Sequence, residues 1–352
     1  MNVHRLRAAV RRPAREYEAW PLTVSRVGLA AVIAATLALA ALGVRPTIRQ
    51  QAAVYVFGMV ALNLPHGGYE HLTNLRRRTS DFRWRYVAGY LLLVGAFLGL
   101  FFVAPAAGLA LAVTVACLKG GHGGLAVLDA TYGTDHLRTR TQRALAVAVR
   151  GGVVMLVPMY SHTDTFLAYS GFMVSMFDPA AAEVVARHAG TTRLLAIGGW
   201  GALAFAHVTL GYVRGGGRSW LLDAGETALL GVYFSVVPVV VAVGLYFPVW
   251  YSGRQVARHR AVSERPAAGD DLLAADTAGG VALRAWGMLV AGAVATAAVV
   301  GIIWLAAPNP MGGAPLLPGL VVFWSVAISI VALPHVVVGS WVDTDQGIWY
   351  VP

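Results

Sequence analysis

Long apolar stretches alternate along the chain with short polar segments that contain arginine. The first such stretch covers residues 24–44, and about twenty helical residues suffice to cross the hydrocarbon core of a bilayer. The pattern predicts an all-α, polytopic integral membrane helix bundle with about eight to ten transmembrane helices. The further candidate spans are 51–66, 86–104, 106–128, 143–160, 193–213, 221–251, 282–307 and 317–341.

Composition supports a membrane protein over a large water-soluble helical domain. The 352 residues are 57% hydrophobic and only 12% charged, whereas about a quarter of the residues in a soluble globular protein are charged. The basic segment 1–22 precedes the first span without the short apolar core of a signal peptide. We therefore expect a cytoplasmic N-terminal segment at 1–22 and a single multispanning domain at 23–352, located in the cell membrane.

The net charge of +10 comes almost entirely from arginine. The arginines lie between apolar stretches rather than on one polar domain, which argues against nucleic-acid binding. Because cytoplasmic loops are enriched in Lys and Arg, we expect the clusters Arg76–Arg78 and Arg138–Arg143 to face the cytoplasm. A third arginine cluster, at 254–265, faces the cytoplasm as well only if the chain crosses the membrane once more before it. The short stretch 164–177 is the candidate for that crossing, unless it is re-entrant or interfacial.

Seven of the ten histidines fall into two groups by position. Ionisable groups at membrane depth are costly and are functional by default, although each of those histidines could instead form a structural hydrogen bond between helices. Those in or at the ends of apolar stretches are His66, His122, His207 and His335. Those in polar segments, where a solvated surface position is expected, are His4, His136 and His188.

Two of the intramembrane histidines have glycine neighbours. His66 lies in PHGGYE and His122 in KGGHGGLAVLD, and glycine permits close backbone approach and broken helix geometry. A neutral imidazole is a good ligand for iron, copper or zinc. The chain has no local HxxxH or CxxC spacing, so a metal site would have to be assembled from separate helices.

Four motifs in order resemble the Brp/Blh family of microbial β-carotene 15,15′-dioxygenases. They are NLPHGGYE (63–70), LKGGHGGLAVLD (118–129), the stretch 226–255, which resembles a long helix of the family, and LPHVVV (333–338). The resemblance implies oxidative cleavage of β-carotene, or a related carotenoid, at its central double bond to give retinal, with O2 and non-haem Fe(2+). It places His66 and His122 at the first two iron-ligand positions. It also makes Glu70 and Arg254 the candidate catalytic residues.

The chain departs from the family pattern at three positions. The resemblance expects two further ligand histidines four residues apart, where this chain has Tyr251 and Gln255, and another histidine where it has Arg150. Tyr251 as phenolate and Gln255 through its carbonyl oxygen are the candidates for the remaining ligands, although both are poorer than imidazole for ferrous iron. The alternatives that remain open are His259, His207, Glu70 and, less favoured, His71.

Three functions are therefore open at this point. The first is a carotenoid dioxygenase that acts on β-carotene or a related apolar polyene within the lipid and that supplies retinal, with a rhodopsin as the possible acceptor. The second is a non-catalytic carotenoid- or retinal-binding or rhodopsin-assembly relative that has lost iron. The third, a small-solute transporter, has less support because the sequence lacks the internal repeats of many transporters.

Overall fold

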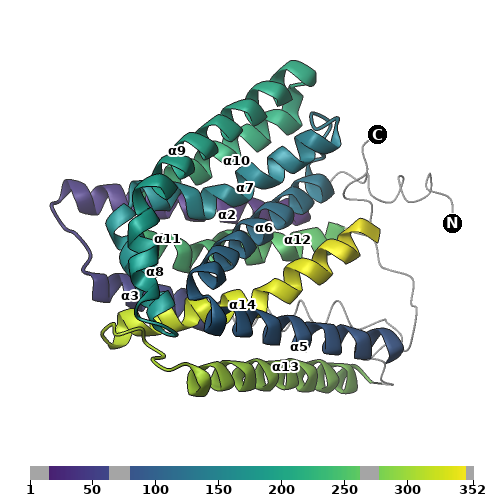
Figure 1. The fold of residues 1–352 in the computed structure, drawn as a ribbon. Helices are drawn as coiled ribbons and strands as arrows, with labels where there is room; N and C mark the ends of the chain where they lie inside the picture. Colours follow the sequence, from purple (N-terminus) through teal and green to yellow (C-terminus); the bar gives the residue numbers. More distant parts are fainter. Residues whose placement is uncertain (1–15, 63–79, 262–276, 346–352) are drawn as a thin grey trace.

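The computed structural model describes residues 16–62, 80–261 and 277–345. Within these ranges all regular structure is helical (Figure 1). Seven of the described helices are long and apolar enough to cross a membrane. The predicted polytopic helical membrane fold is therefore confirmed. The seven are α2 (Glu16–Ala41), α5 (Ser80–Val103), α6 (Pro105–Thr131), α7 (Arg140–Ser161), α9 (Ala181–Arg214), α13 (Ala278–Ala306) and α14 (Leu316–Asp345).

Shorter elements complete the described bundle. Two of them are π-helical turns, η1 (Phe57–Leu62) and η2 (Tyr246–Ser252). Residues 51–62 of the predicted span at 51–66 are divided between α3 and η1, whereas 63–66 lie outside the described residues. The stretch 221–251 is divided among α10, α11 and η2. The short α-helices are α3 (Ile48–Val56), α8 (Thr163–Ser175), α10 (Gly217–Val236), α11 (Val239–Leu245) and α12 (Gly253–Ala261).

Several helices begin at a residue that caps them. Thr47, Thr139 and Thr277 precede α3, α7 and α13, and each hydroxyl accepts a hydrogen bond from the backbone N–H three residues further on. Such caps satisfy one of the backbone donors that a helix start leaves without a partner. α6 instead begins with Pro105, whose missing N–H is not needed at this position.

The stretch that resembles one long helix is a helical hairpin, and the expectation of a single helix is wrong. Val237 is extended, with φ −79° and ψ 130°, because the ring of the following Pro238 disfavours the helical conformation at the residue before it. The Tyr233 hydroxyl donates to the carbonyl oxygen of Ala242 across the break at 2.9 Å. Further out, Arg254 donates to Glu226 at 2.8 Å, so the chain after Pro238 runs antiparallel to α10.

This hairpin decides at which end of the bundle the arginines gather. α2, α5, α7, α10 and α13 all begin at one end, where α6, α9, α12 and α14 also end (Figure 1). Arg83 and Arg85 lie at this end with Arg138–Arg143, and α12 brings Arg258 there. α8 lies across the opposite end (Figure 1), so the stretch 164–177 does not cross the bundle. The extra crossing comes from α10, while Arg76–Arg78 lie outside the described residues.

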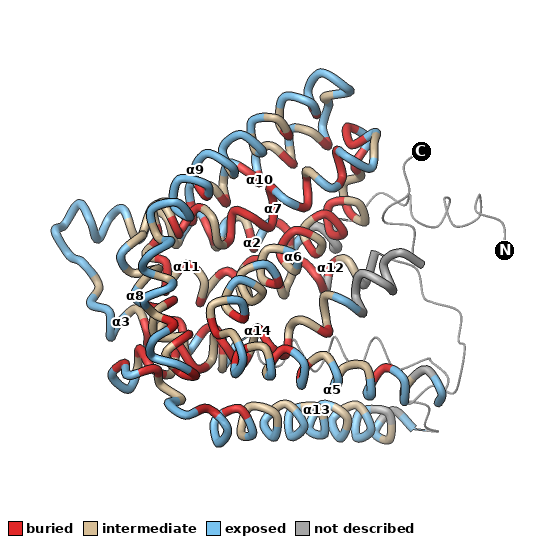
Figure 2. Tube along the Cα trace, viewed as in Figure 1, coloured by how far each residue is buried: buried red, intermediate tan, exposed pale blue. Residues whose placement is uncertain are grey.

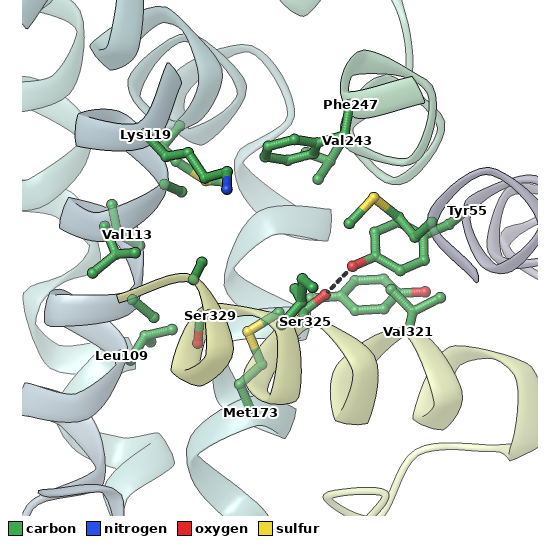
Figure 3. Close-up of a pocket in the computed structure, with 18 of the residues that line it drawn as sticks. Tyr55, Leu109, Val113, Lys119, Met173, Val243, Phe247, Val321, Ser325 and Ser329 are labelled. Atoms are coloured by element: carbon green, nitrogen blue, oxygen red, sulfur yellow. Dashed lines mark hydrogen bonds between the residues drawn. The ribbon is translucent and has the colours of Figure 1, made fainter. Parts of the chain in front are cut away.

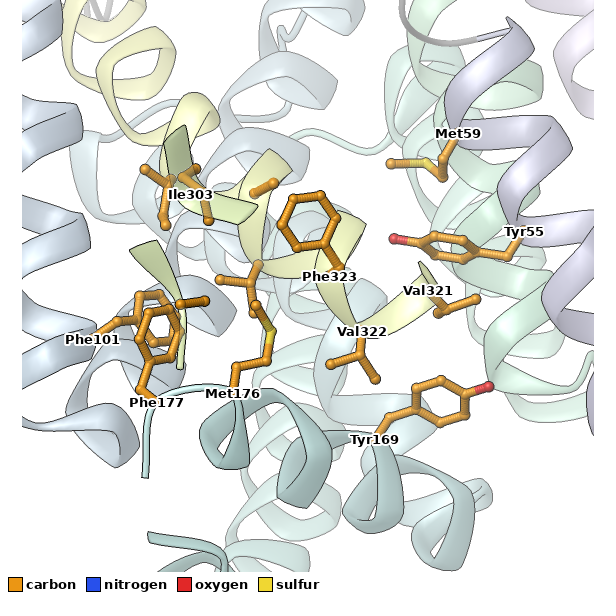
Figure 4. Packing of buried hydrophobic residues seen from close by; sticks show 14 of the residues in the cluster. Tyr55, Met59, Phe101, Tyr169, Met176, Phe177, Ile303, Val321, Val322 and Phe323 are labelled. Atoms are coloured by element: carbon orange, nitrogen blue, oxygen red, sulfur yellow. The ribbon is translucent and has the colours of Figure 1, made fainter. Parts of the chain in front are cut away.

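The helices pack through both small and large side chains. On the face between α6 and α7, a methyl group at Gly121 would overlap the carbonyl of Val147, and one at Gly151 would overlap that of Cys117. Small residues allow this approach between membrane helices. Figure 4 shows the larger core cluster around α14, where the rings of Phe101 and Phe177 stack with centroids 5.1 Å apart.

The outer helices present apolar side chains outward. Figure 2 shows α9 and α13 largely exposed along their outer sides. Leu194 and Phe205 of α9 are 72% and 74% exposed, and Leu305 of α13 is 85% exposed. Continuous apolar surface of this extent is typical of contact with lipid rather than with water.

Candidate active site

The centre of the candidate site is the backbone of α6 at Gly123 and Gly124, next to His122. Tyr251 of η2 and Gln255 of α12 pack directly on Gly123. A Cβ atom there would lie 2.5 Å from Tyr251 Cε2, 2.6 Å from Gln255 Nε2 and 2.9 Å from the Tyr251 hydroxyl. Only glycine leaves room for both side chains, so the glycine run of α6 brings the candidate ligand positions 251 and 255 against the helix backbone next to His122.

Both π-helical turns adjoin this site. η2 carries Tyr251, and η1 ends at Leu62, just before the segment that contains His66. The two are brought together where Gly58 approaches the backbone of Gly244, since a Cβ at Gly58 would overlap the Gly244 carbonyl oxygen. π-Helical turns inside α-helices are frequent at functional sites. The close approach of Gly58 to Gly244 therefore holds η1 next to the end of α11, from which η2 continues.

Behind Gly123 and Gly124 lies a buried network of arginines and carboxylates. Glu226 of α10 accepts hydrogen bonds from Arg26 at 2.6 Å and from Arg254 at 2.8 Å, and it pairs with Arg150 as well. Arg150 also pairs with Asp223. Because both carboxylates are within 2% of complete burial and a buried charge is tolerated only when paired, these pairs hold α2, α7, α10 and α12 together.

Two histidines complete this ion network at Asp223. The Nε2 atoms of His136 and His207 lie 2.9 Å and 3.0 Å from one Asp223 carboxylate oxygen, and His136 Nδ1 lies 3.0 Å from the Ser219 hydroxyl. The expectation of a solvated His136 is wrong, since this residue is 1% exposed. His207, an alternative metal ligand on sequence grounds, is instead engaged by Asp223. His188 is exposed, as expected.

The ion network reaches the candidate site through two of its arginines. The Arg150 side chain lies over Gly124, with Nε 3.1 Å from the position that a Cβ would occupy. Arg254 directly precedes Gln255, and its guanidinium carbon lies 4.1 Å from the centroid of the Trp250 ring. Its polar end is held by Glu226, so Arg254 is fixed on both sides.

An apolar cavity of about 200 Å³ lies on the other side of the site (Figure 3). Its walls come from α3, η1, α6, α7, α8, α11, η2, α13 and α14, and Tyr251 forms part of the wall. The hydroxyl groups of Tyr55 and Ser325 are 2.6 Å apart, and one donates a hydrogen bond to the other. His335, in the closing Pro-His motif, also lines the cavity, and its Nδ1 donates to the Val331 carbonyl oxygen at 2.9 Å.

Comparison with known proteins decides the family. The family model described as β-carotene 15,15′-dioxygenase matches residues 57–343. This chain belongs to the β-carotene 15,15′-dioxygenase family. It is 54% identical over 339 residues to the probable β-carotene 15,15′-dioxygenase Brp of Halobacterium salinarum, with 94% of each chain covered. It is 36% identical over 339 residues to the probable β-carotene 15,15′-dioxygenase Blh of the same species, with 90% of each covered. No solved structure matches the chain.

The three departures from the dioxygenase pattern lie side by side. Tyr251 and Gln255 contact Gly123, and Arg150 contacts the next residue, Gly124. Sequence separation hides this clustering, because Arg150 precedes the other two by a hundred positions. The resemblance therefore expects histidines at positions that the structure places around one short stretch of α6.

The fit of this site to a metal ion depends on which donor atoms lie near Gly123. Gln255 Nε2 is buried and has no hydrogen-bond partner among the residues that the structure describes, so an unsatisfied amide donor, which is not itself a metal ligand, lies against Gly123. In the same part of the chain, no three His, Cys, Asp or Glu residues are grouped closely enough to hold a metal. Tyr251 and Gln255 lie together beside the backbone that carries His122, but the described residues do not supply a complete metal site. The candidates His66, Glu70 and His71, and the side chain of His259, lie outside the described residues.

Proposed function

We propose that this protein cleaves β-carotene, or a related carotenoid, at the central double bond to give retinal. The observation that carries the proposal is membership of the β-carotene 15,15′-dioxygenase family across residues 57–343. The names of the Brp and Blh relatives agree with it. We further propose that the protein works in the cell membrane and that a rhodopsin accepts its retinal.

The cavity provides what an apolar polyene requires. Val113, Phe247 and Val321 are among its apolar lining residues, and the hydroxyls of Tyr55 and Ser325 are hydrogen-bonded to each other rather than aimed singly at a hydrocarbon chain. Apolar walls favour a polyene and exclude water from its double bonds. Tyr251 extends from this wall to Gly123, so a polyene in the cavity would approach the candidate ligand positions.

Ferrous iron and O2 belong to the proposal as cofactor and co-substrate. We infer that His66 and His122 hold the iron, with Tyr251 and Gln255 as oxygen donors. Activation of dioxygen for double-bond cleavage is the chemistry that the iron would supply when bound. The protein's own contribution is position, because the contact with Gly123 fixes Tyr251 and Gln255, and Glu226 fixes Arg254 beside them. Glu70 remains a candidate catalytic residue.

Expression in β-carotene-producing cells tests the activity. We expect the protein to produce retinal and to remove the orange colour. His122→Ala should abolish both effects because it removes a proposed ligand. His188→Ala is the matched control, since His188 is exposed and donates only to the carbonyl of Val184 in its own helix. Persistent colour with the wild-type protein, at normal expression and iron supply, would refute the proposed activity.

A second experiment tests the ligand assignment. The double change Tyr251→His and Gln255→His should raise the iron content of the purified protein, because imidazoles four residues apart on a helix can bind one metal. Both positions face Gly123, so the new imidazoles would converge there. Should iron content rise while retinal yield stays at zero, the carotenoid assignment is wrong. An unchanged iron content would instead overturn the placement of the metal.

A further inference from the structure

The chain contains a single lysine, Lys119, and it lies inside the membrane bundle. A lysine at the centre of a spanning helix costs about 2.5 to 3.5 kcal/mol on insertion scales. Elsewhere the chain uses arginine for its basic residues. Arginine remains protonated and is no nucleophile, whereas the lysine amine forms Schiff bases with carbonyl compounds. Placing the Lys119 amine within the membrane therefore costs free energy, and a function of this amine would explain why the chain retains it.

Lys119 lines the apolar cavity, and Figure 3 shows its amine pointing away from α6 into the space beside Phe247. Nζ lies 5.5 Å from the centroid of the Tyr251 ring. Lys119 and His122 are three residues apart on α6, which places them on the same side of the helix. The amine thus stands between the apolar cavity and the residues proposed to surround the cleavage point.

We propose that Lys119 forms a reversible imine with a long apolar aldehyde, namely the retinal made at this site. The inference rests on the proposed function, because cleavage of the carotenoid supplies the aldehyde. The neutral amine attacks the aldehyde carbon, both nitrogen protons pass to the former carbonyl oxygen, and that oxygen leaves as water as the C=N bond forms. No oxidant or reductant is needed, and addition of water returns retinal and the free amine.

The cavity gives this imine a function. Its walls surround the polyene chain, and their exclusion of water slows the hydrolysis that would release the aldehyde. Retinal would then stay attached to the enzyme until water, or the amine of an acceptor, displaces Lys119. Exchange with an acceptor amine forms one C=N bond as another breaks, so retinal passes on without being released as free aldehyde.

Reductive trapping tests the proposal directly. The purified full-length protein is mixed with all-trans-retinal and treated with borohydride, which reduces an imine to a stable secondary amine, and the peptides are examined by mass spectrometry. We expect a retinyl group on the peptide that carries Lys119. The matched control is the double variant Lys119→Arg and Arg140→Lys, which moves the only lysine to an exposed position at the start of α7. This variant should lose the adduct.

The outcomes separate this inference from the proposed function, because retinal is supplied rather than made. Absence of the Lys119 adduct in a protein that cleaves β-carotene overturns the imine and leaves the cleavage activity standing. Equal labelling of the lysine at position 140 also overturns it, since the reaction would then need no cavity. An adduct on Lys119 in a protein that fails to cleave β-carotene supports the aldehyde site and refutes the cleavage activity.

Discussion

Glu226 is the residue whose loss should destabilise the bundle most clearly. Its carboxylate is 2% exposed and pairs with the guanidinium groups of Arg26, Arg150 and Arg254. Glu226→Gln keeps the size of the side chain but removes its charge, so three arginines lose their shared anion. Breaking a buried ion pair by removing one partner costs about 3 to 5 kcal/mol. We expect the free energy of unfolding to fall by at least this amount. Of the three arginines, only Arg150 would still have a carboxylate partner in this network, which is Asp223.

Thermal unfolding of the detergent-purified protein, followed by circular dichroism, measures the effect. The control is Asp81→Asn at the start of α5, which removes the same kind of charge from the pair between Asp81 and Arg85. These two groups are 3.2 Å apart and are 68% and 78% exposed. An exposed pair contributes about 0 to 1 kcal/mol, so the unfolding temperature should fall far less in the control.

Equal unfolding temperatures of Glu226→Gln and Asp81→Asn would refute the expected stabilisation by Glu226. The energetic role of the buried network would then be no greater than that of a surface pair. Glu226→Gln should also lower the retinal yield, because Arg254 would no longer be held beside Gln255. A variant that is destabilised but retains full retinal yield would restrict the network to a structural role.

Two further predictions follow from the geometry. Gly123→Ala should lower both thermal stability and retinal yield, because its methyl group would lie 2.5 Å from Tyr251 Cε2. The control Gly199→Ala, where a Cβ meets nothing within 4 Å, should leave both intact. Equal effects of the two changes would contradict the proposed packing. The second prediction uses single cysteines in a variant that lacks Cys117. Arg45→Cys, at an exposed position, should react with an impermeant thiol reagent added to intact cells, whereas Asp135→Cys, at the arginine-rich end, should not. Labelling of position 135 would reverse the predicted orientation.

Apolar patterning predicts the long helices well because each must cover its own backbone with apolar side chains in lipid. The stretches 86–104 and 317–341, for example, correspond to α5 and α14. The same reasoning fails at 221–251, where length and hydropathy suggest one span. Pro238 is the signal that breaks this stretch, because it restricts Val237 to an extended conformation.

The ion network was missed for a different reason. Its partners lie far apart in the sequence, as Arg150 and Asp223 do, and no local pattern joins them. A partial signal was present, since Asp223 and Glu226 lie one turn apart within an apolar stretch, where buried acids need cationic partners. The polar neighbours of His136 predict a surface position, but its burial depends on how the 132–139 connection folds against α9 and α10.

The buried ion network also limits which residues can act as ligands in the proposed metal site. A guanidinium group has five hydrogen-bond donors and no free lone pair, so Arg150 cannot serve as a metal ligand in place of the further histidine that the resemblance expects at its position. Its charge is balanced by Asp223 and Glu226, which leaves neither carboxylate unpaired for a metal. Ligands near Gly123 must therefore come from the opposite side, where α6, η2 and α12 meet. Restoring histidine at 150 alone should leave the iron content unchanged, whereas restoring it at 251 and 255 should raise it.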